Sequence, residues 1–253
     1  MTPEPLHPTG TAGPDLLSME LSDPIPPSVT GLTPVPEDPL GADESYRDLP
    51  GSHGEHLLQR AFGTQDRAKR FYADQVLDHL NEEMRAFIGR MEMAFVGTAD
   101  GKGDCDVSLR AGSAGFVQVL GERELAYPEY RGNGVMASLG NISENPHVAM
   151  LLVDFVSDLI GLHVNGSARI VEDAELRVQH PGLPVAAERG RTPERWVVLH
   201  VDEAYIHCRK HIPRMVPVDR TRDWGTDEAR PKGGDYFRAK GVNGQRRHAW
   251  AAH

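Results

Sequence analysis

Short strand-like segments follow one another from Met91 to Val201, and this succession restricts the fold more than any other feature of the sequence. Turns of hairpin length, such as Asp100-Gly101-Lys102-Gly103, join most of them. Residues 147–155 are almost wholly apolar, as expected of a strand buried on both faces. About six short strands joined in this way predict a small closed β-barrel.

The remaining periodic segments predict helices that flank this barrel. Apolar residues recur at helical spacing from Thr64 to Ile88, which predicts one long packing helix that Gly89 ends. Glycines at positions 161 and 166 lie inside a strand-like segment, where β-bulges or bends of a barrel occur. The expected fold class is therefore mostly β with flanking helices, α+β.

The two ends of the chain differ in composition from its centre. Residues 1–50 hold 11 of the 19 prolines and no aromatic residue before Tyr46. Such a segment cannot bury enough apolar surface to offset the entropy lost on ordering, so we expect a disordered Pro-rich acidic arm, with a specific docking peptide as the alternative. The folded domain is expected to span residues 51–216, and residues 217–253 to form an extended C-terminal arm.

The charge distribution excludes several classes of partner. Met1 to Tyr46 contains eight acidic and no basic residues, so the rest of the chain, with 27 basic and 29 acidic residues, is nearly neutral. A nucleic-acid-binding domain normally carries a basic excess. No stretch approaches the roughly 18 apolar residues of a membrane helix. With two cysteines and no leader-like start, the sequence predicts a cytoplasmic protein with neither a nucleic-acid nor a membrane partner.

The loop 128–134 is the strongest candidate for a binding site. It follows two strand-like runs and opens a predicted helix at Val135, and it places Arg131 before a Gly-Asn-Gly sequence. Backbone N–H groups of such a loop and of a helix start attract anions, and Arg110 on a preceding strand could add a second guanidinium. The loop therefore predicts a phosphate site. The alternative is an ordinary strand-to-helix turn beside solvated arginines.

Other common chemistries find little support in the sequence. Gly101-Lys102-Gly103 precedes a strand where a dinucleotide fingerprint needs a helix, no P-loop is present, and Ser113 lacks the spacing of a nucleophile elbow. Cys208 and His211 could share a metal ion or a haem, but no second cysteine pair accompanies them. We therefore predict no metal site and assign no catalytic residue.

Several segments, taken in order, carry a resemblance to a known family. Their order and spacing resemble the pyridoxamine 5′-phosphate oxidase-like FMN-binding split-barrel family over about residues 87–214. The segments are Asp106-Val107-Ser108-Leu109-Arg110, Gly115-Phe116-Val117-Gln118-Val119-Leu120, Leu125-Ala126-Tyr127-Pro128 through Arg131-Gly132-Asn133, Asn141-Ile142-Ser143-Glu144-Asn145-Pro146 and Val164-Asn165-Gly166-Ser167-Ala168-Arg169-Ile170.

The resemblance implies a six-stranded split β-barrel that forms a homodimer, with FMN in a groove that both subunits share. It places Ser108, Arg110, Arg131 and Asn133 at the flavin phosphate, together with the backbone of Gly132. Two further residues, Tyr127 and Pro128, would line the pocket near the ribityl chain or the ring. Arg209 and Lys210 would reach the flavin ring from the partner chain.

The sequence also departs from the oxidases proper. The full Arg-x-x-x-Leu-Lys strand signature and the C-terminal Arg-Leu-x-Pro signature are absent. In the true oxidases these parts contact the vitamin phosphate and the ring, so the expectation is a flavin-dependent oxidoreductase that moves a hydride between FMN and another small molecule. The alternative is a non-catalytic protein that binds flavin, deazaflavin or haem. A haem-degrading enzyme, with His207 or His211 as the iron ligand, is a third alternative.

Overall fold

The computed structural model of the protein describes residues 49–185, 190–218 and 233–239. The predicted acidic arm, residues 1–50, lies almost entirely outside the described residues, as does most of the predicted C-terminal arm, residues 217–253.

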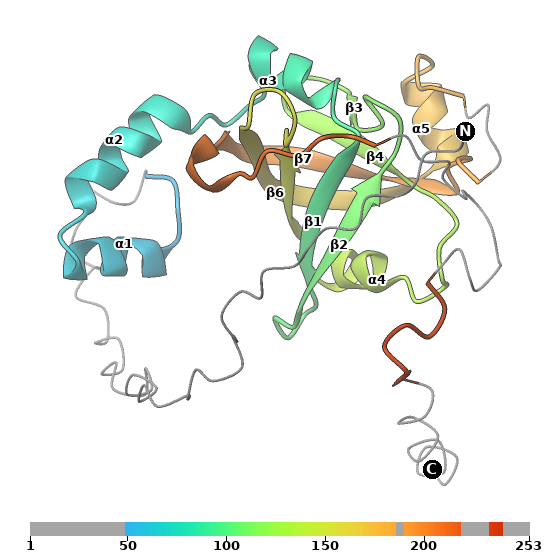
Figure 1. Ribbon diagram of the computed structural model, residues 1–253, viewed down its shortest axis with the longest axis horizontal. Helices are drawn as coiled ribbons and strands as arrows, with labels where there is room; N and C mark the ends of the chain where they lie inside the picture. Colours follow the sequence, from blue (N-terminus) through green and yellow to red (C-terminus); the bar gives the residue numbers. More distant parts are fainter. Residues whose placement is uncertain (1–48, 186–189, 219–232, 240–253) are drawn as a thin grey trace, which may run out of the picture. The chain divides into compact units, whose positions relative to one another are not determined.

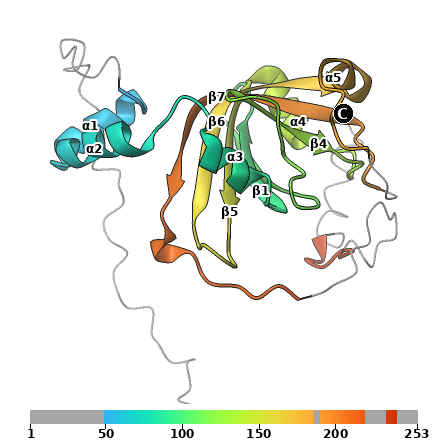
Figure 2. The same cartoon turned by 90° about the horizontal axis from the view of Figure 1, so that it is seen from above.

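Seven strands form a single antiparallel sheet in the order β2-β1-β5-β6-β7-β4-β3 (Figure 1). The sheet is strongly curved (Figure 2). The strands are β1 Met93–Ala99, β2 Cys105–Ala111, β3 Gln118–Val119, β4 Glu124–Glu129, β5 His147–Val153, β6 Gly161–Glu172 and β7 Arg195–His207.

The predicted closed, six-stranded barrel is wrong in two respects. The sheet has seven strands, and β2 and β3 remain its two edges, with no pairing between them among the described residues. With two residues, β3 offers too few backbone groups to carry the ladder on to β2. The long strands β6 and β7, of 12 and 13 residues, pair with each other along nearly their whole length.

A β-bulge lies where the sequence predicts one. The register between β6 and β7 shifts between Asn165 and Gly166. A Cβ atom on Gly166 would lie 1.9 Å from the carbonyl oxygen of His200, so only glycine fits this close approach of two backbones. Gly161, at the start of β6, is similarly confined, since its Cβ would lie 2.8 Å from the carbonyl oxygen of Leu152.

The main core lies against one face of the curved sheet. Alternate residues of β1 are buried, and so are those of β5, whose pattern contradicts the expected burial on both faces. Ala149 on β5 is exposed and Leu151 is half-buried. Through the strand pairings these two residues share a face with Val107 and Leu109 of β2, which are exposed. The sheet therefore presents an apolar outer strip.

The predicted helix 64–88 is two helices separated by an extended segment. Between them Leu77 pairs with Ala204 of β7, its N–H donating over 3.0 Å and its carbonyl accepting over 2.7 Å. Asn81 then caps the second helix by accepting from the N–H of Met84. The described helices are α1 His53–Ala61, α2 Gln65–Gln75, α3 Glu82–Ile88, α4 Ala137–Glu144 and α5 Asp173–Gln179, with a 3-10 turn, η3, at Arg209–His211. Of the described helices, none is both long and apolar enough to cross a membrane.

Candidate functional site

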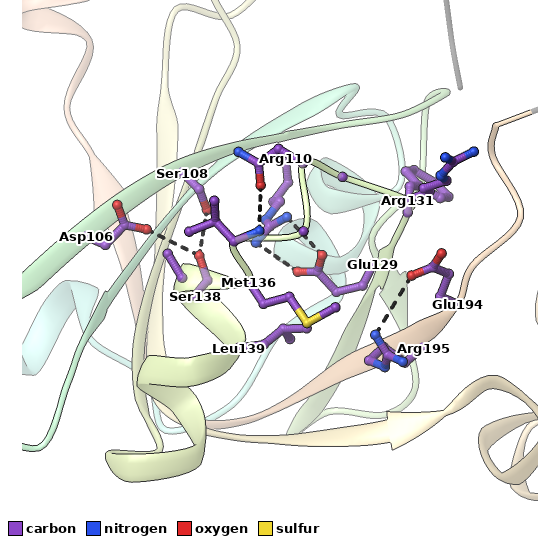
Figure 3. A pocket seen from close by; sticks show the side chains of 16 residues that line it. Asp106, Ser108, Arg110, Glu129, Arg131, Met136, Ser138, Leu139, Glu194 and Arg195 are labelled. Atoms are coloured by element: carbon purple, nitrogen blue, oxygen red, sulfur yellow. Dashed lines mark hydrogen bonds and ion pairs between the residues drawn. The ribbon is translucent and has the colours of Figure 1, made fainter. Parts of the chain in front are cut away.

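A cavity of about 810 Å³ lies where β2, the end of β4, the loop 130–136 and the starts of α4 and β7 meet (Figure 3). Its size is within the range of small-molecule sites, roughly 300–1,000 Å³. β2 is an edge strand, and its alternating side chains give the cavity one wall while the opposite face of the same strand is apolar and exposed. The cavity therefore forms at the sheet edge next to the apolar outer strip.

Two serine hydroxyls meet at the wall formed by β2 and α4. Ser108 Oγ on β2 lies 3.1 Å from Ser138 Oγ in the first turn of α4. Ser138 also donates to Asp106 Oδ2 over 3.4 Å, and it is buried. Either hydroxyl can rotate to donate to a ligand, because a serine O–H turns about its Cβ–Oγ bond to suit its partners.

Arg110 and Glu129 form a partly buried ion pair on the cavity wall, in which Glu129 is the buried partner. Arg110 Nη1 donates to Glu129 Oε2 over 3.0 Å, and Nη2 lies 2.8 Å from Oε1. The Arg110 guanidinium also lies 5.6 Å from the centre of the Tyr127 ring, a cation–π distance. Sequence reasoning missed Glu129. The available signal was an acid at the end of an otherwise apolar strand, because a buried carboxylate requires a partner.

The electrostatics of this wall depend on the burial of the Glu129 carboxyl group. Burial raises the pKa of the Glu129 carboxyl, while Arg110 and, more weakly, Arg195 act in the opposite direction. Burial also raises the pKa of Tyr127, whose hydroxyl has no hydrogen-bond partner among the described residues. Three guanidinium groups line the cavity, and three carboxyl groups nearly balance their charge. These are Arg110, Arg131 and Arg195, and Asp106, Glu129 and Glu194.

The loop 130–136 folds tightly, although no other part of the described chain approaches its glycines closely. Asn133 Oδ1 accepts from the N–H of Val135 over 3.0 Å, and Gly134 has φ +82°, a conformation that glycine adopts readily. A Cβ on Gly132 would meet nothing within 4 Å, so space does not require glycine there. The helix begins two residues later than predicted, after Met136 at φ 57°, and no side chain caps it. Its first N–H groups thus lie at the cavity without a capping side chain.

Five of the eight predicted site residues line this one cavity. They are Ser108, Arg110, Arg131, Gly132 and Asn133. The Arg131 side chain is directed away from the Arg110–Glu129 pair, so the two predicted guanidinium groups diverge (Figure 3).

The other three predicted residues lie elsewhere. Tyr127 is fully buried beneath the cavity, and Pro128 lines a separate cavity of about 300 Å³. Lys210 lies in η3, beyond the opposite end of β7. Its predicted contact is with a second chain and stays a prediction.

The histidines considered as haem or metal ligands lie outside the cavity lining. His207 Nδ1 is 3.0 Å from His163 Nε2, and the His163 ring stacks on Tyr205 with ring centres 4.7 Å apart. Within residues 49–185, 190–218 and 233–239, no three or more His, Cys, Asp or Glu side chains are grouped to hold a metal ion.

Comparisons with solved structures return proteins of low identity. HupZ from Group A Streptococcus is 21% identical over 49% of this chain and 90% of its own, with a TM-score of 0.36. A pyridoxamine 5′-phosphate oxidase-like protein from Lactobacillus delbrueckii is 20% identical over 51% and 95%, with a TM-score of 0.38. The heme storage protein HutZ from Vibrio cholerae is 15% identical over 51% and 93%, with a TM-score of 0.33. No curated protein matches the chain.

A family model gives the assignment. The model described as pyridoxamine 5′-phosphate oxidase matches residues 80–208, which is just over half of the chain and spans the sheet from β1 to β7 together with the cavity wall. The chain therefore belongs to the pyridoxamine 5′-phosphate oxidase family.

Proposed function

We propose that the cavity beside β2 binds the phosphate end of FMN and that the protein is a flavin-dependent oxidoreductase. One observation carries the proposal: Ser108 and Arg110 from the sheet edge and Ser138 from the first turn of α4 line a single cavity. Hydroxyls, a guanidinium and the start of a helix are the donors that bind a phosphate in proteins. Family membership supports the same ligand.

The hydrogen-bond donors of the cavity fit a phosphate, whereas the neighbouring Glu129 carboxylate opposes one. The hydroxyls of Ser108 and Ser138, 3.1 Å apart, can both donate to one phosphate oxygen. Arg110 Nε is buried and lacks a hydrogen-bond partner among the described residues. The carboxylate of Glu129, however, occupies the outer edge of Arg110. Arg110 can therefore serve as a phosphate ligand only after it separates from Glu129.

Bound flavin would supply the hydride chemistry, and the protein's own residues hold and orient the molecule. Ser108 and Ser138 fix the phosphate against the sheet edge. Arg131 and Asn133, on the loop, close the cavity on its solvent side. We assign no acid or base among the side chains of the cavity.

We further propose that the site is completed by a second copy of the chain. Val107 and Leu109 expose 68% and 59% of their surface on the face of β2 that points away from the cavity. Phe95 and Leu151 continue this apolar strip across β1 and β5. Exposed apolar strips of this kind mark interfaces. A partner packed there would border the cavity, and the sequence predicts that Lys210 of a partner chain reaches the flavin ring.

Titration of the purified full-length protein with FMN tests the first proposal. We expect a 1:1 complex per chain with flavin absorption bands that shift on binding, and weaker binding of riboflavin, which lacks the phosphate. A protein that is colourless when purified and leaves the FMN spectrum and fluorescence unchanged would contradict it.

Reduction and reoxidation of the bound flavin distinguish an oxidoreductase from the alternative, a protein that only stores or carries the flavin. The missing oxidase signatures favour a substrate other than pyridoxamine phosphate. Anaerobic mixing of the flavin complex with NADH or NADPH should bleach the flavin bands, and oxygen should restore them. A flavin that binds tightly but is neither reduced nor reoxidised would favour the carrier.

A further inference from the structure

Glu129 occupies the edge of Arg110 that a phosphate would use. Nη1 of Arg110 donates to Oε2 over 3.0 Å, and Nη2 lies 2.8 Å from Oε1 in an ion-pair contact that is not a hydrogen bond. A guanidinium binds a phosphate through the same terminal nitrogens. The Glu129 carboxylate and a phosphate therefore cannot hold this edge together.

The Arg110 side chain is 23% exposed, but its Nε is not accessible. The ring of Tyr127 lies 5.6 Å from the central carbon of the guanidinium, and Nε is buried. Glu129 is itself buried at the end of β4. Because Nε is buried, a two-point contact is open to a ligand only at the two terminal nitrogens, where the ligand takes the place of the Glu129 carboxylate.

We propose that Glu129 is the specificity-determining residue of this cavity: its carboxylate competes with the ligand phosphate for Arg110, and a phosphate gains that contact as Glu129 takes up a proton from solvent. The inference rests on the proposed function, because it assigns a role within the same phosphate site. In the ligand-free protein the Glu129 carboxylate pairs with Arg110. In the complex Arg110 pairs with the phosphate, the Glu129 carboxyl is neutral, and one proton has been consumed.

The groups around Glu129 are consistent with this exchange. Burial raises the pKa of the carboxyl, and Arg110 is the main group that opposes the rise. When Arg110 turns to a phosphate dianion, the opposing influence weakens and a second negative charge arrives, and both changes favour protonation. The other charged or titratable groups near Glu129 are Tyr127 on its own strand, Glu194 and Arg195 on the β7 side, Asp106 on β2, and Tyr130 and Arg131 on the loop. Helix α4 contributes the uncharged Ser138 and Leu139.

A purely structural ion pair makes different predictions. If Arg110 and Glu129 stay paired when a ligand binds, neutralising Glu129 changes stability but leaves the preference for FMN over riboflavin as it was. Competition instead affects only ligands that carry a phosphate, because riboflavin leaves the pair intact.

Calorimetric titration with FMN and with riboflavin distinguishes the two. It compares the full-length protein with Glu129→Gln, which keeps the shape of the side chain and an acceptor oxygen for Arg110. We expect the variant to bind FMN about tenfold more tightly, since one charge-assisted two-point contact no longer has to be exchanged. Riboflavin should bind both proteins equally.

Proton uptake is measured in the same titrations with two buffers of different ionisation enthalpy. At about pH 7.5 the flavin phosphate, with a second pKa of about 6, is almost fully dianionic and contributes little. The wild-type protein should take up a proton on binding FMN and none on binding riboflavin, and Glu129→Gln should take up none with either.

Glu194→Gln is the matched control. It removes the same charge from the same cavity, but Glu194 pairs with Arg195, at 3.8 Å, and not with Arg110. Its gain in FMN affinity should fall well short of tenfold. Equal FMN affinities for wild type and Glu129→Gln, a gain that Glu194→Gln reproduces, a gain shared by riboflavin, or absence of proton uptake by the wild type would each overturn the proposal.

Inorganic phosphate separates this inference from the flavin assignment. In thermal unfolding, phosphate should raise the melting temperature of Glu129→Gln more than that of the wild type. If neither protein binds FMN but phosphate raises their melting temperatures by different amounts in this way, the flavin assignment fails and the role of Glu129 stands. Identical phosphate shifts in the two proteins would overturn the role of Glu129.

Discussion

At the scale of single residues, the paired hydroxyls offer the most direct test of the phosphate site. Ser138→Ala removes one donor from the cavity and should weaken FMN binding by about tenfold, because a hydrogen bond to a charged group contributes roughly 1.5–3 kcal/mol. Ser143→Ala is the control, since this serine lies on the same helix but donates to the carbonyl oxygen of Gly140, outside the cavity. Fluorescence titration measures both. Equal losses in the two variants, or none in Ser138→Ala, would remove Ser138 from the site.

Arg110→Ala should reduce stability as well as flavin affinity. It leaves the Glu129 carboxylate buried without its partner, which costs about 3 kcal/mol or more in buried pairs. Arg169→Ala breaks a largely exposed ion pair with Glu124 and should cost about 1 kcal/mol or less. Urea unfolding gives both values, and the double variant Arg110→Met/Glu129→Leu should recover much of the loss. A similar cost for Arg169→Ala and Arg110→Ala would mean that the pair of Arg110 and Glu129 is not important for stability.

The residues of the site were largely predictable, whereas their pairing was not. Ser108, Arg110, Arg131, Gly132 and Asn133 were expected at one place, and they line one cavity. Their order along the chain carries that information. It carries none about which acid faces Arg110, because that depends on the register of β2 and β4, strands that lie near opposite edges of a curved sheet. For the same reason Tyr127 could not be recognised as a fully buried residue.

At the scale of elements, the bulge between β6 and β7 depends on one glycine. Gly166→Ala places a Cβ 1.9 Å from the carbonyl oxygen of His200, and two paired backbones cannot easily separate there. We expect a loss of at least about 2 kcal/mol in the free energy of unfolding, as for other overpacked interiors. Gly121→Ala is the control, because its Cβ would meet nothing within 4 Å. Chemical denaturation that shows equal stability for both variants would contradict the close approach.

The elements that sequence reasoning placed wrongly are those decided by distant partners. Helical spacing runs through Val76 and Leu80, but the backbone of Leu77 pairs with Ala204 of β7, more than a hundred residues away, and the helix ends. β5 looked buried on both faces because the residues of its outer face are also apolar. Local pattern specified the strands and the bulge well. It could not show that the outer face of the sheet has no cover within the described chain.

At the scale of the whole molecule, that outer face and the cavity are coupled through β2. One side of the strand carries Ser108 and Arg110, and the other carries Val107 and Leu109. A change on the apolar side therefore leaves the side chains of the cavity in place. If a second copy completes the site, such a change should nevertheless weaken flavin binding. Assembly and ligand affinity would then fall together.

Leu109→Asp tests this coupling. A charge placed in an apolar interface without a partner is strongly unfavourable, so we expect a dimer of the wild-type protein to become a monomer, measured by light scattering after size exclusion. FMN affinity should fall in the same variant, although Ser108 and Arg110 are untouched. Val178→Asp is the control, since Val178 is 82% exposed on α5 and away from β2. A monomeric wild type that binds FMN as tightly as Leu109→Asp would show that each chain forms its site alone.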